Sequence, residues 1–245
     1  MPHYYTNDNV YSNNEYTFRY TFKGIEFSFT SNDGVFSKRR VDFGTNLLIN
    51  SLEDLSNKKV LDLGCGVGVM GILIAKGFSK TEVMLSDVNE KAIELTNKNI
   101  SANGVKNAKV VVSSLFDSID CAFDVIVSNP PIRAGKKIVH SVILEGFKHL
   151  NKDGFVYVVI QKKQGADSMK KVMEETFGNV QIVNKESGYL VLKSIKNWWC
   201  LKMIHIDKLM WYYIIVKAYG GNYEKSICFY ICYDVCILIS WLWFD

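Results

Sequence analysis

Two short runs near the start of the chain alternate hydrophobic and polar residues. Thr17–Phe22 and Ile25–Thr30 follow this period of two and are rich in aromatic residues, which is typical of β-strands. Only Lys23 and Gly24 separate the two runs, so they are predicted to form a β-hairpin. After Gly44 the apolar residues recur at helical spacing, which predicts a helix. These apolar residues are Leu47, Leu48, Leu52 and Leu55.

From residue 59 onward, short apolar runs alternate with longer segments of helical pattern. The predicted strands are Val60–Leu63, Glu82–Ser86, Lys109–Val112, Phe123–Ser128, Phe155–Ile160, Val180–Val183 and Tyr189–Ser194. The predicted helices are Val69–Lys76, Asn89–Ala102 with Asn89 as its cap, Lys137–Leu150, which a loop at residues 151–154 closes, and Gly165–Phe177. This alternation predicts an α/β fold with a mostly parallel seven-stranded sheet and helices on both faces. No helix fits between the last two strands, so the last strand is expected to be antiparallel.

The composition of the chain changes abruptly after Lys196. All five tryptophans and four of the six cysteines lie beyond this residue. Residues 197–245 show neither clean alternation nor a helical stripe. We therefore expect three parts: a β-hairpin with an entry helix at 1–56, an α/β domain at 57–196, and an aromatic, cysteine-rich tail at 197–245 that is not part of the fold.

Three interpretations of this tail compete. Ile227–Phe244 is long enough for a membrane helix, but Asp234 near its middle costs roughly 2.5–3.5 kcal/mol on insertion. Three cysteines, Cys228, Cys232 and Cys236, recur every four residues, so a helix would place them on one face as a metal site. Only Cys200 and His205 could complete the set of ligands, and this spacing is unlike that of zinc sites. We favour the third interpretation, an accidental extension such as translation past a lost stop codon.

The overall composition, with 48% hydrophobic and 22% charged residues, is typical of a globular protein. The net charge of +4 is compatible with a nucleic-acid partner but does not by itself argue for one. The polar start of the chain lacks the apolar run of a secretory signal. Before Lys196 only Cys65 and Cys121 occur, too few for a disulfide framework, so a cytoplasmic location is expected.

A glycine-rich loop, LDLGCGVG at residues 61–68, joins the first strand of the sheet to its first helix. Glycines allow a sharp turn and close approach of a ligand to the N–H groups of the helix N-terminus. The pattern suits a pyrophosphate or the carboxylate of a methionyl group. Asp62 within the strand end favours the second, because it suits the ammonium of a methionine moiety. Asp87 ends the next strand, where a carboxylate can accept both hydroxyl protons of a ribose. The alternative is a loop that serves only the tight turn.

A second loop, Asn129-Pro130-Pro131-Ile132, follows the strand at Phe123–Ser128. Its prolines make it stiff and leave its carbonyl groups free to face a ligand. The Asn129 side-chain oxygen and the Pro130 carbonyl can together hold the two protons of a planar amino group. This geometry favours a pyramidal nitrogen whose lone pair points at a methyl donor, so methylation of an exocyclic amine needs no strong base. The alternative is a merely rigid loop, but carboxyl ends of parallel strands are where ligands bind.

Together these segments resemble the class I S-adenosylmethionine-dependent methyltransferases of the small-domain type, which have a Rossmann-like fold. They are most similar to single-domain enzymes that methylate guanine N2 of small-subunit ribosomal RNA. The segments that carry the resemblance are VLDLGCGVG at 60–68, Ser86-Asp87, NPPIRAGK at 129–136, VIQKKQGA at 159–166, and the entry motif GVFS at 34–37 with VDFG at 41–44. The resemblance runs from about Tyr16 to Lys196.

The resemblance implies S-adenosyl-L-methionine as the cofactor and an N-methyltransferase activity. The implied cofactor-binding residues are Asp62, Gly64, Cys65, Gly66, Gly68, Asp87, Val88, Ser114 and Leu115, of which the last two would line the adenine pocket. The implied catalytic residues are Asn129, Pro130, Pro131 and Ile132. Many amino-methyltransferases have an aromatic residue at the position of Ile132, and stacking of that ring on a base is worth about 1–3 kcal/mol. The departure speaks against adenine-N6 DNA enzymes and protein glutamine methyltransferases.

Basic residues near both motifs are expected at the carboxyl-end face of the sheet, where they would contact RNA phosphates. The assigned RNA-binding residues are Phe36, Lys38, Arg39, Arg40, Arg133, Lys136 and Lys137. Lys162 and Lys163 join them, with ordinary solvated charge as the alternative. The expected partner is ribosomal RNA or the small ribosomal subunit, with no metal and no membrane. Alternative functions are adenine-N6 or protein amide methylation, and a cofactor-binding RNA-binding protein that has lost catalysis.

Overall fold

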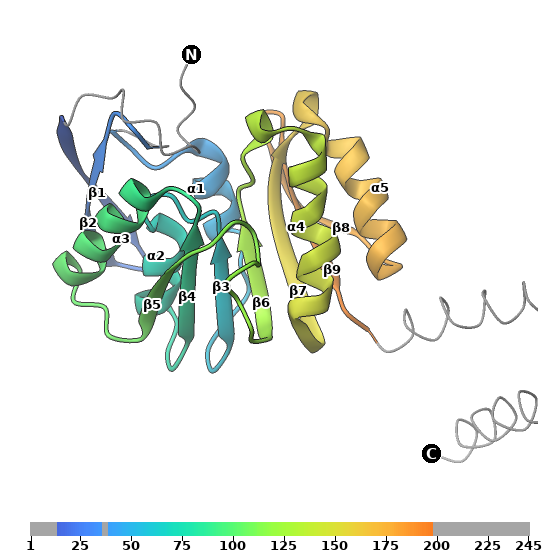
Figure 1. Cartoon of the computed structure of the whole chain (residues 1–245), viewed down its shortest axis with the longest axis horizontal. Helices are drawn as coiled ribbons and strands as arrows, with labels where there is room; N and C mark the ends of the chain where they lie inside the picture. Colours follow the sequence, from blue (N-terminus) through green and yellow to red (C-terminus); the bar gives the residue numbers. More distant parts are fainter. Residues whose placement is uncertain (1–13, 36–38, 198–245) are drawn as a thin grey trace, which may run out of the picture. The chain divides into compact units, whose positions relative to one another are not determined.

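A seven-stranded sheet forms the centre of the described chain (Figure 1). The computed structural model describes residues 14–35 and 39–197. In spatial order the strands are β5 (Ala108–Val112), β4 (Glu82–Asp87), β3 (Lys59–Leu63), β6 (Phe123–Ser128), β7 (Leu150–Gln161), β9 (Tyr189–Ile195) and β8 (Gln181–Glu186). The strands β5 to β7 are mutually parallel, and β9 is antiparallel to both of its neighbours. The predicted fold class is confirmed.

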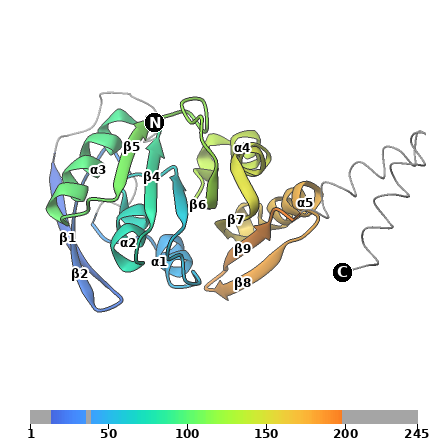
Figure 2. The same cartoon turned by 90° about the horizontal axis from the view of Figure 1, so that it is seen from below.

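The helices divide between the two faces of the sheet (Figure 2). One face packs against α1 (Phe43–Ile49), α2 (Val69–Gly77) and α3 (Glu90–Ala102). The other face packs against α4 (Lys136–His149) and α5 (Ala166–Phe177). Because side chains alternate along a strand, Val125 and Val127 of β6 join the first core while Ile126 joins the second. Two one-turn 3₁₀ segments complete the order, η1 (Ile132–Ala134) and η2 (Lys162–Gln164).

The predicted hairpin forms from β1 (Glu15–Phe22) and β2 (Ile25–Asn32) and lies beside α3 (Figure 1). Asn99 of α3 and Asn103, the C-cap of this helix, hydrogen-bond the backbone of β2 along its free edge, as a neighbouring strand would. Asn99 accepts from the Thr30 N–H at 2.7 Å and donates to the Thr30 carbonyl at 2.9 Å. Asn103 makes the same pair of bonds to Ser28. The hairpin therefore has a fixed position against the sheet domain, and its aromatic residues share the first core.

The predicted loop at residues 151–154 is wrong. The helix α4 passes directly into β7, which begins at Leu150 rather than at Phe155. Leu150 is buried and pairs with Phe123, and the register then shifts before Val125 pairs with Phe155. Asp153 takes a positive φ of 59° at this irregularity, where the N–H of Asp153 bonds the Lys196 carbonyl. Residues 151–154 thus form a bulge between two pairs with β6, and their backbone bonds Lys196 instead.

Within residues 14–35 and 39–197, no helix is long and apolar enough to cross a membrane. The same part of the chain holds no group of three or more potential metal-ligating side chains. The hypotheses about the tail at 198–245, including its cysteines, lie outside the described residues, as do the assigned RNA contacts Phe36 and Lys38.

Candidate active site

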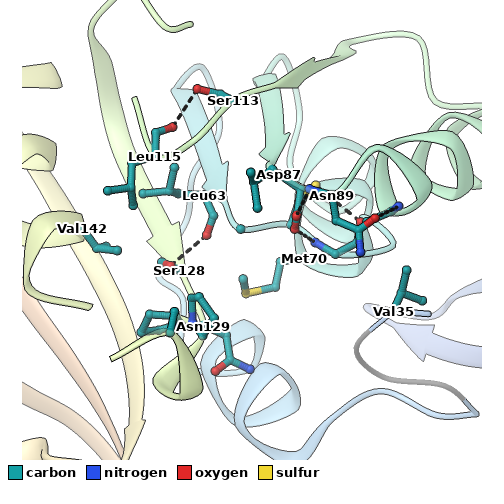
Figure 3. Close-up of a pocket in the computed structure, with 18 of the residues that line it drawn as sticks. Val35, Leu63, Met70, Asp87, Asn89, Ser113, Leu115, Ser128, Asn129 and Val142 are labelled. Carbon is teal, nitrogen blue, oxygen red and sulfur yellow. Dashed lines mark hydrogen bonds between the residues drawn. The ribbon is translucent and has the colours of Figure 1, made fainter. Parts of the chain in front are cut away.

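A cavity of about 280 Å³ opens at the carboxyl ends of β3, β4 and β6 (Figure 3). Its walls come from the glycine loop, the start of α2, the end of β4, the segment after β5, the Asn-Pro-Pro loop and α4. Parallel sheets bind ligands at this edge because loops there leave backbone groups and side chains free to converge. The cavity therefore brings the two loops singled out by the sequence into one site.

The glycine loop adopts a conformation that only glycine accepts without strain at three positions. Gly64, Gly66 and Gly68 have φ values of 74°, 57° and 83°. The N–H groups of Gly64 and Cys65 donate to the Ser86 carbonyl at 2.9 Å each, which ties the loop to the end of β4. Gly68 begins α2 as its N-cap and lies behind the cavity, where a Cβ would come within 2.8 Å of Thr96. Gly64, Cys65 and Gly66 line the cavity itself.

Asp87 lies at the end of β4 and lines the cavity beside Val88. Its two oxygens accept from the N–H groups of Gly66 at 2.8 Å and Asn89 at 2.9 Å. Burial raises the pKa of Asp87, while these N–H donors act in the opposite direction. A carboxylate has about four acceptor positions, so the group can still accept from a ligand hydroxyl.

Asp62, expected to contact the cofactor, lies beneath the cavity rather than in its lining. It is fully buried in β3, and its Oδ2 accepts from the N–H of Gly71 at 2.7 Å. Its Oδ1 has no hydrogen-bond partner in the described structure. Burial raises the pKa of Asp62 to about 7, and the nearby Asp87 charge adds to that shift. Asp62 thus joins the strand to the start of α2 under the glycine loop.

Asn129 is held by two acceptors on the N-terminal turn of α1. Its Nδ2 donates to Asp42 Oδ2 at 3.2 Å and to Thr45 Oγ1 at 3.0 Å. An ionised carboxylate only accepts hydrogen bonds, so the amide must turn its nitrogen toward Asp42. The Asn129 oxygen consequently has no donor among the described residues, and the carbonyl of Pro130 likewise accepts no hydrogen bond there. Both residues line the cavity, so each brings an acceptor without a described protein donor to this site.

The segment after β5 closes another side of the cavity. Ser114 and Leu115 both line it. Leu115 has a positive φ of 51°, and its carbonyl accepts from the Ser113 hydroxyl at 3.0 Å. Ile132 is half-buried against the second core and is not part of the lining, whereas Pro130 and Pro131 are. The aliphatic residue in the Asn-Pro-Pro-Ile loop thus packs inward in this structure.

Six of the basic residues that the sequence assigned to RNA binding lie in the described part of the structure, and all six are exposed around this edge of the sheet. Arg39 and Arg40 precede α1, Lys136 and Lys137 begin α4, and Lys162 and Lys163 follow β7. Arg39 also lies over the Tyr16 ring, with its guanidinium carbon 4.3 Å from the ring centroid. The side chain of Arg133 lies outside the described part of the structure. None of the described six lines the cavity.

Sequence reasoning missed the two residues that hold Asn129. Asp42 and Thr45 lie 87 and 84 positions earlier in the chain, and spacing alone does not join segments so far apart. A signal for Asp42 was present, because an aspartate directly before a helical pattern is a common N-cap. Its second contact, with Asn129 of the Asn-Pro-Pro loop, required the tertiary structure.

Comparison with known proteins identifies the class. The 16S rRNA N2 methyltransferase RsmC of T. thermophilus, solved in complex with AdoMet and guanosine, has the same fold with a TM-score of 0.68 and 26% identity. The match covers 74% of this chain and 50% of that one. The strand order and the fold are thus those of a class I methyltransferase. The chain belongs to the methyltransferase small domain family, whose model matches residues 26–193.

Two relatives show how far the similarity extends. Uncharacterized protein YbxB of Bacillus subtilis (strain 168) is 43% identical over 197 residues, covering 79% of this chain and 98% of the relative. Ribosomal RNA small subunit methyltransferase C of Colwellia psychrerythraea is 33% identical over 185 residues, covering 72% of this chain. The chain spans about half the length of that second relative.

Proposed function

We propose that this chain is an S-adenosylmethionine-dependent N-methyltransferase whose target is guanine N2 of small-subunit ribosomal RNA. The observation that carries the proposal is the pair of free acceptors, Asn129 Oδ1 and the Pro130 carbonyl, at the edge of the cavity. An exocyclic NH2 group presents two protons, and two acceptors held rigidly can bind both. Holding them favours the pyramidal nitrogen that attacks a methyl group.

The residues around the cavity fit S-adenosylmethionine, which supplies an electrophilic methyl group on a sulfonium centre. Asp87 offers lone pairs to the ribose hydroxyls, and the left-handed glycine loop leaves room for close approach of a ligand to the backbone. Val88, Ser114 and Leu115 would border the adenine. Cys65 serves as a wall and not as a nucleophile, because burial raises the pKa of its thiol well above the ordinary range.

The choice of ribosomal RNA rests on the relatives. The small-subunit methyltransferase C proteins match this chain over about half of their length, and the solved T. thermophilus enzyme is named for 16S rRNA N2 methylation. The exposed basic residues Arg39, Arg40, Lys136 and Lys137 would bind phosphates of the same RNA. Ribosomal RNA or the small subunit is the proposed partner, and the cytoplasm is the proposed location.

The direct test supplies labelled S-adenosylmethionine with naked ribosomal RNA, assembled small subunits, DNA or protein. Nucleoside mass spectrometry of the product should identify N2-methylguanosine. Label found only in N6-methyladenosine, or only in protein, would replace the guanine proposal with one of the alternative amine targets. No transfer to any substrate, with cofactor bound, would support a binding protein without catalysis.

The Asn129→Ala variant tests the mechanism. It removes one of the two acceptors, so transfer should fall by at least about 10²-fold, while the affinity for S-adenosylmethionine changes less than about threefold. Calorimetric titration of the cofactor serves as the control for folding and binding. An active Asn129→Ala enzyme would refute the assigned role of the side chain.

A further inference from the structure

The two oxygens of the Asp42 carboxylate differ sharply in their surroundings. Oδ2 accepts from three N–H donors: Gly44 at 2.9 Å, Thr45 at 3.3 Å and the Asn129 side chain at 3.2 Å. Oδ1 has no hydrogen-bond partner among the described residues, and no described Lys or Arg forms an ion pair with Asp42. The side chain is only half-buried, at the N-terminus of α1.

This arrangement sets a second free acceptor group beside the catalytic amide. The bond from Asn129 to Asp42 joins the two planar groups, and the Asp42 bonds to the N–H groups of Gly44 and Thr45 prevent the carboxylate from turning away. Asn129 Oδ1 and Asp42 Oδ1 thus belong to two groups that are hydrogen-bonded to each other, and neither oxygen accepts from a described residue. A ligand that satisfies both must present two N–H donors next to each other.

We propose that Asp42 selects the target base by accepting the N1–H of a guanine whose N2 amino group is bound by Asn129. This inference rests on the proposed methyl transfer and adds a base-selecting residue to it. On its pairing edge, guanine presents N1–H directly beside the N2 amino group, whereas adenine presents an N1 acceptor beside its N6 amino group. Adenine would set a lone pair against the Asp42 carboxylate, and a site that binds a substrate N–H rejects an analogue that lacks it.

The Asp42→Asn variant separates base selection from the other roles of Asp42. Only an oxygen fits where three N–H donors converge, so the new carboxamide keeps its oxygen at the Oδ2 position. Asparagine is also a good N-cap, so α1 and the orientation of Asn129 are retained. The new NH2 group then occupies the Oδ1 position and presents a donor to the base instead of an acceptor.

The experiment uses a synthetic RNA that carries either guanosine or 2-aminopurine at the nucleotide methylated by the full-length wild-type chain. 2-Aminopurine keeps the 2-amino group but has an acceptor at N1. The wild type should prefer guanosine by at least about 100-fold in kcat/KM. Asp42→Asn should lose at least about 100-fold on guanosine and prefer 2-aminopurine, with S-adenosylmethionine affinity within about twofold of wild type.

Thr45→Val is the matched control. It removes the other acceptor that orients Asn129 while keeping the side-chain shape, so kcat should fall equally on both bases and their ratio should stay unchanged. A preference ratio in Asp42→Asn equal to that of the wild type would overturn the proposal. Discrimination below about threefold by the wild type itself would also overturn it, even if Asp42→Asn did not fold. Absence of any N2-methylguanosine from wild-type reactions would instead count against the proposed function.

Discussion

At the scale of single residues, the buried carboxylate of Asp62 has a measurable consequence for stability. Burial raises its pKa from 3.8 to about 7, although the N–H of Gly71 partly offsets that shift. Between these two pH values the folded chain holds a proton on Asp62 that the unfolded chain has lost. Stability must therefore fall as the pH rises from about 4 to about 7 and then level off.

We predict that Asp62 makes the wild type less stable at pH 8 than at pH 5 by up to about 3 kcal/mol. Between pH 5 and about pH 7 the folded chain holds one proton more than the unfolded chain, and a difference over about two pH units has this free energy. The Asp62→Asn variant has no titrating group at this position and should show a smaller decline. Urea unfolding of both proteins at the two pH values measures the difference. Asp87 is present in both proteins, so its contribution to the pH dependence largely cancels in the comparison. Parallel pH profiles for wild type and variant would contradict the assignment.

At the scale of elements, the packing of α2 against the sheet depends on one glycine within the helix, Gly71. A Cβ at Gly71 would come within 2.4 Å of the fully buried Leu85 side chain and within 3.2 Å of Asp62 Oδ2. The helix therefore approaches β3 and β4 so closely that no larger residue fits. Val69 and Met70 at the start of this helix line the cavity, so displacement of α2 would also reshape the cavity.

The Gly71→Ala substitution should lower the free energy of unfolding by about 1–3 kcal/mol, because overpacking forces backbone shifts. It should also weaken S-adenosylmethionine binding. Gly146→Ala in α4 is the control, because a Cβ at Gly146 would meet no atom closer than 3.5 Å. This substitution should leave the free energy of unfolding unchanged or raise it by up to about 1 kcal/mol. Chemical unfolding and cofactor titration of both variants test the pair, and equal destabilisation by the two would show that the close approach is not the cause.

At the scale of the whole molecule, the family match and the described fold coincide over one continuous part of the chain. The family model ends at residue 193, and β9, the last strand among the described residues, ends at Ile195. Lys196 still bonds back to the domain, through its N–H to the Gly154 carbonyl and its Nζ to the Leu150 carbonyl. We propose that residues 198–245 contribute neither to the core of this domain nor to its site.

A chain that ends after Asn197 should accordingly keep the cofactor affinity and the methyl transfer rate of the full chain within about twofold, since no described core or cavity residue is removed. Its melting temperature should change by less than about 3 °C. Calorimetry and the transfer assay, run side by side on both lengths, measure these quantities. A collapse of folding or activity in the shorter chain would assign the tail a role.

The sequence by itself determined the strand and helix order, the parallel sheet, and the two loops that meet at its carboxyl edge. Periodicity and glycine or proline positions are local signals, and parallel sheets always gather their strand ends at one edge. Only the tertiary structure decided that Asp62 lies beneath the cavity, that residues 151–154 join β7, and that Asp42 and Thr45 orient Asn129. Each of these depends on contacts between residues far apart in the chain or on burial by neighbouring elements. A sequence pattern specifies which face a side chain occupies, but not which partner meets it there.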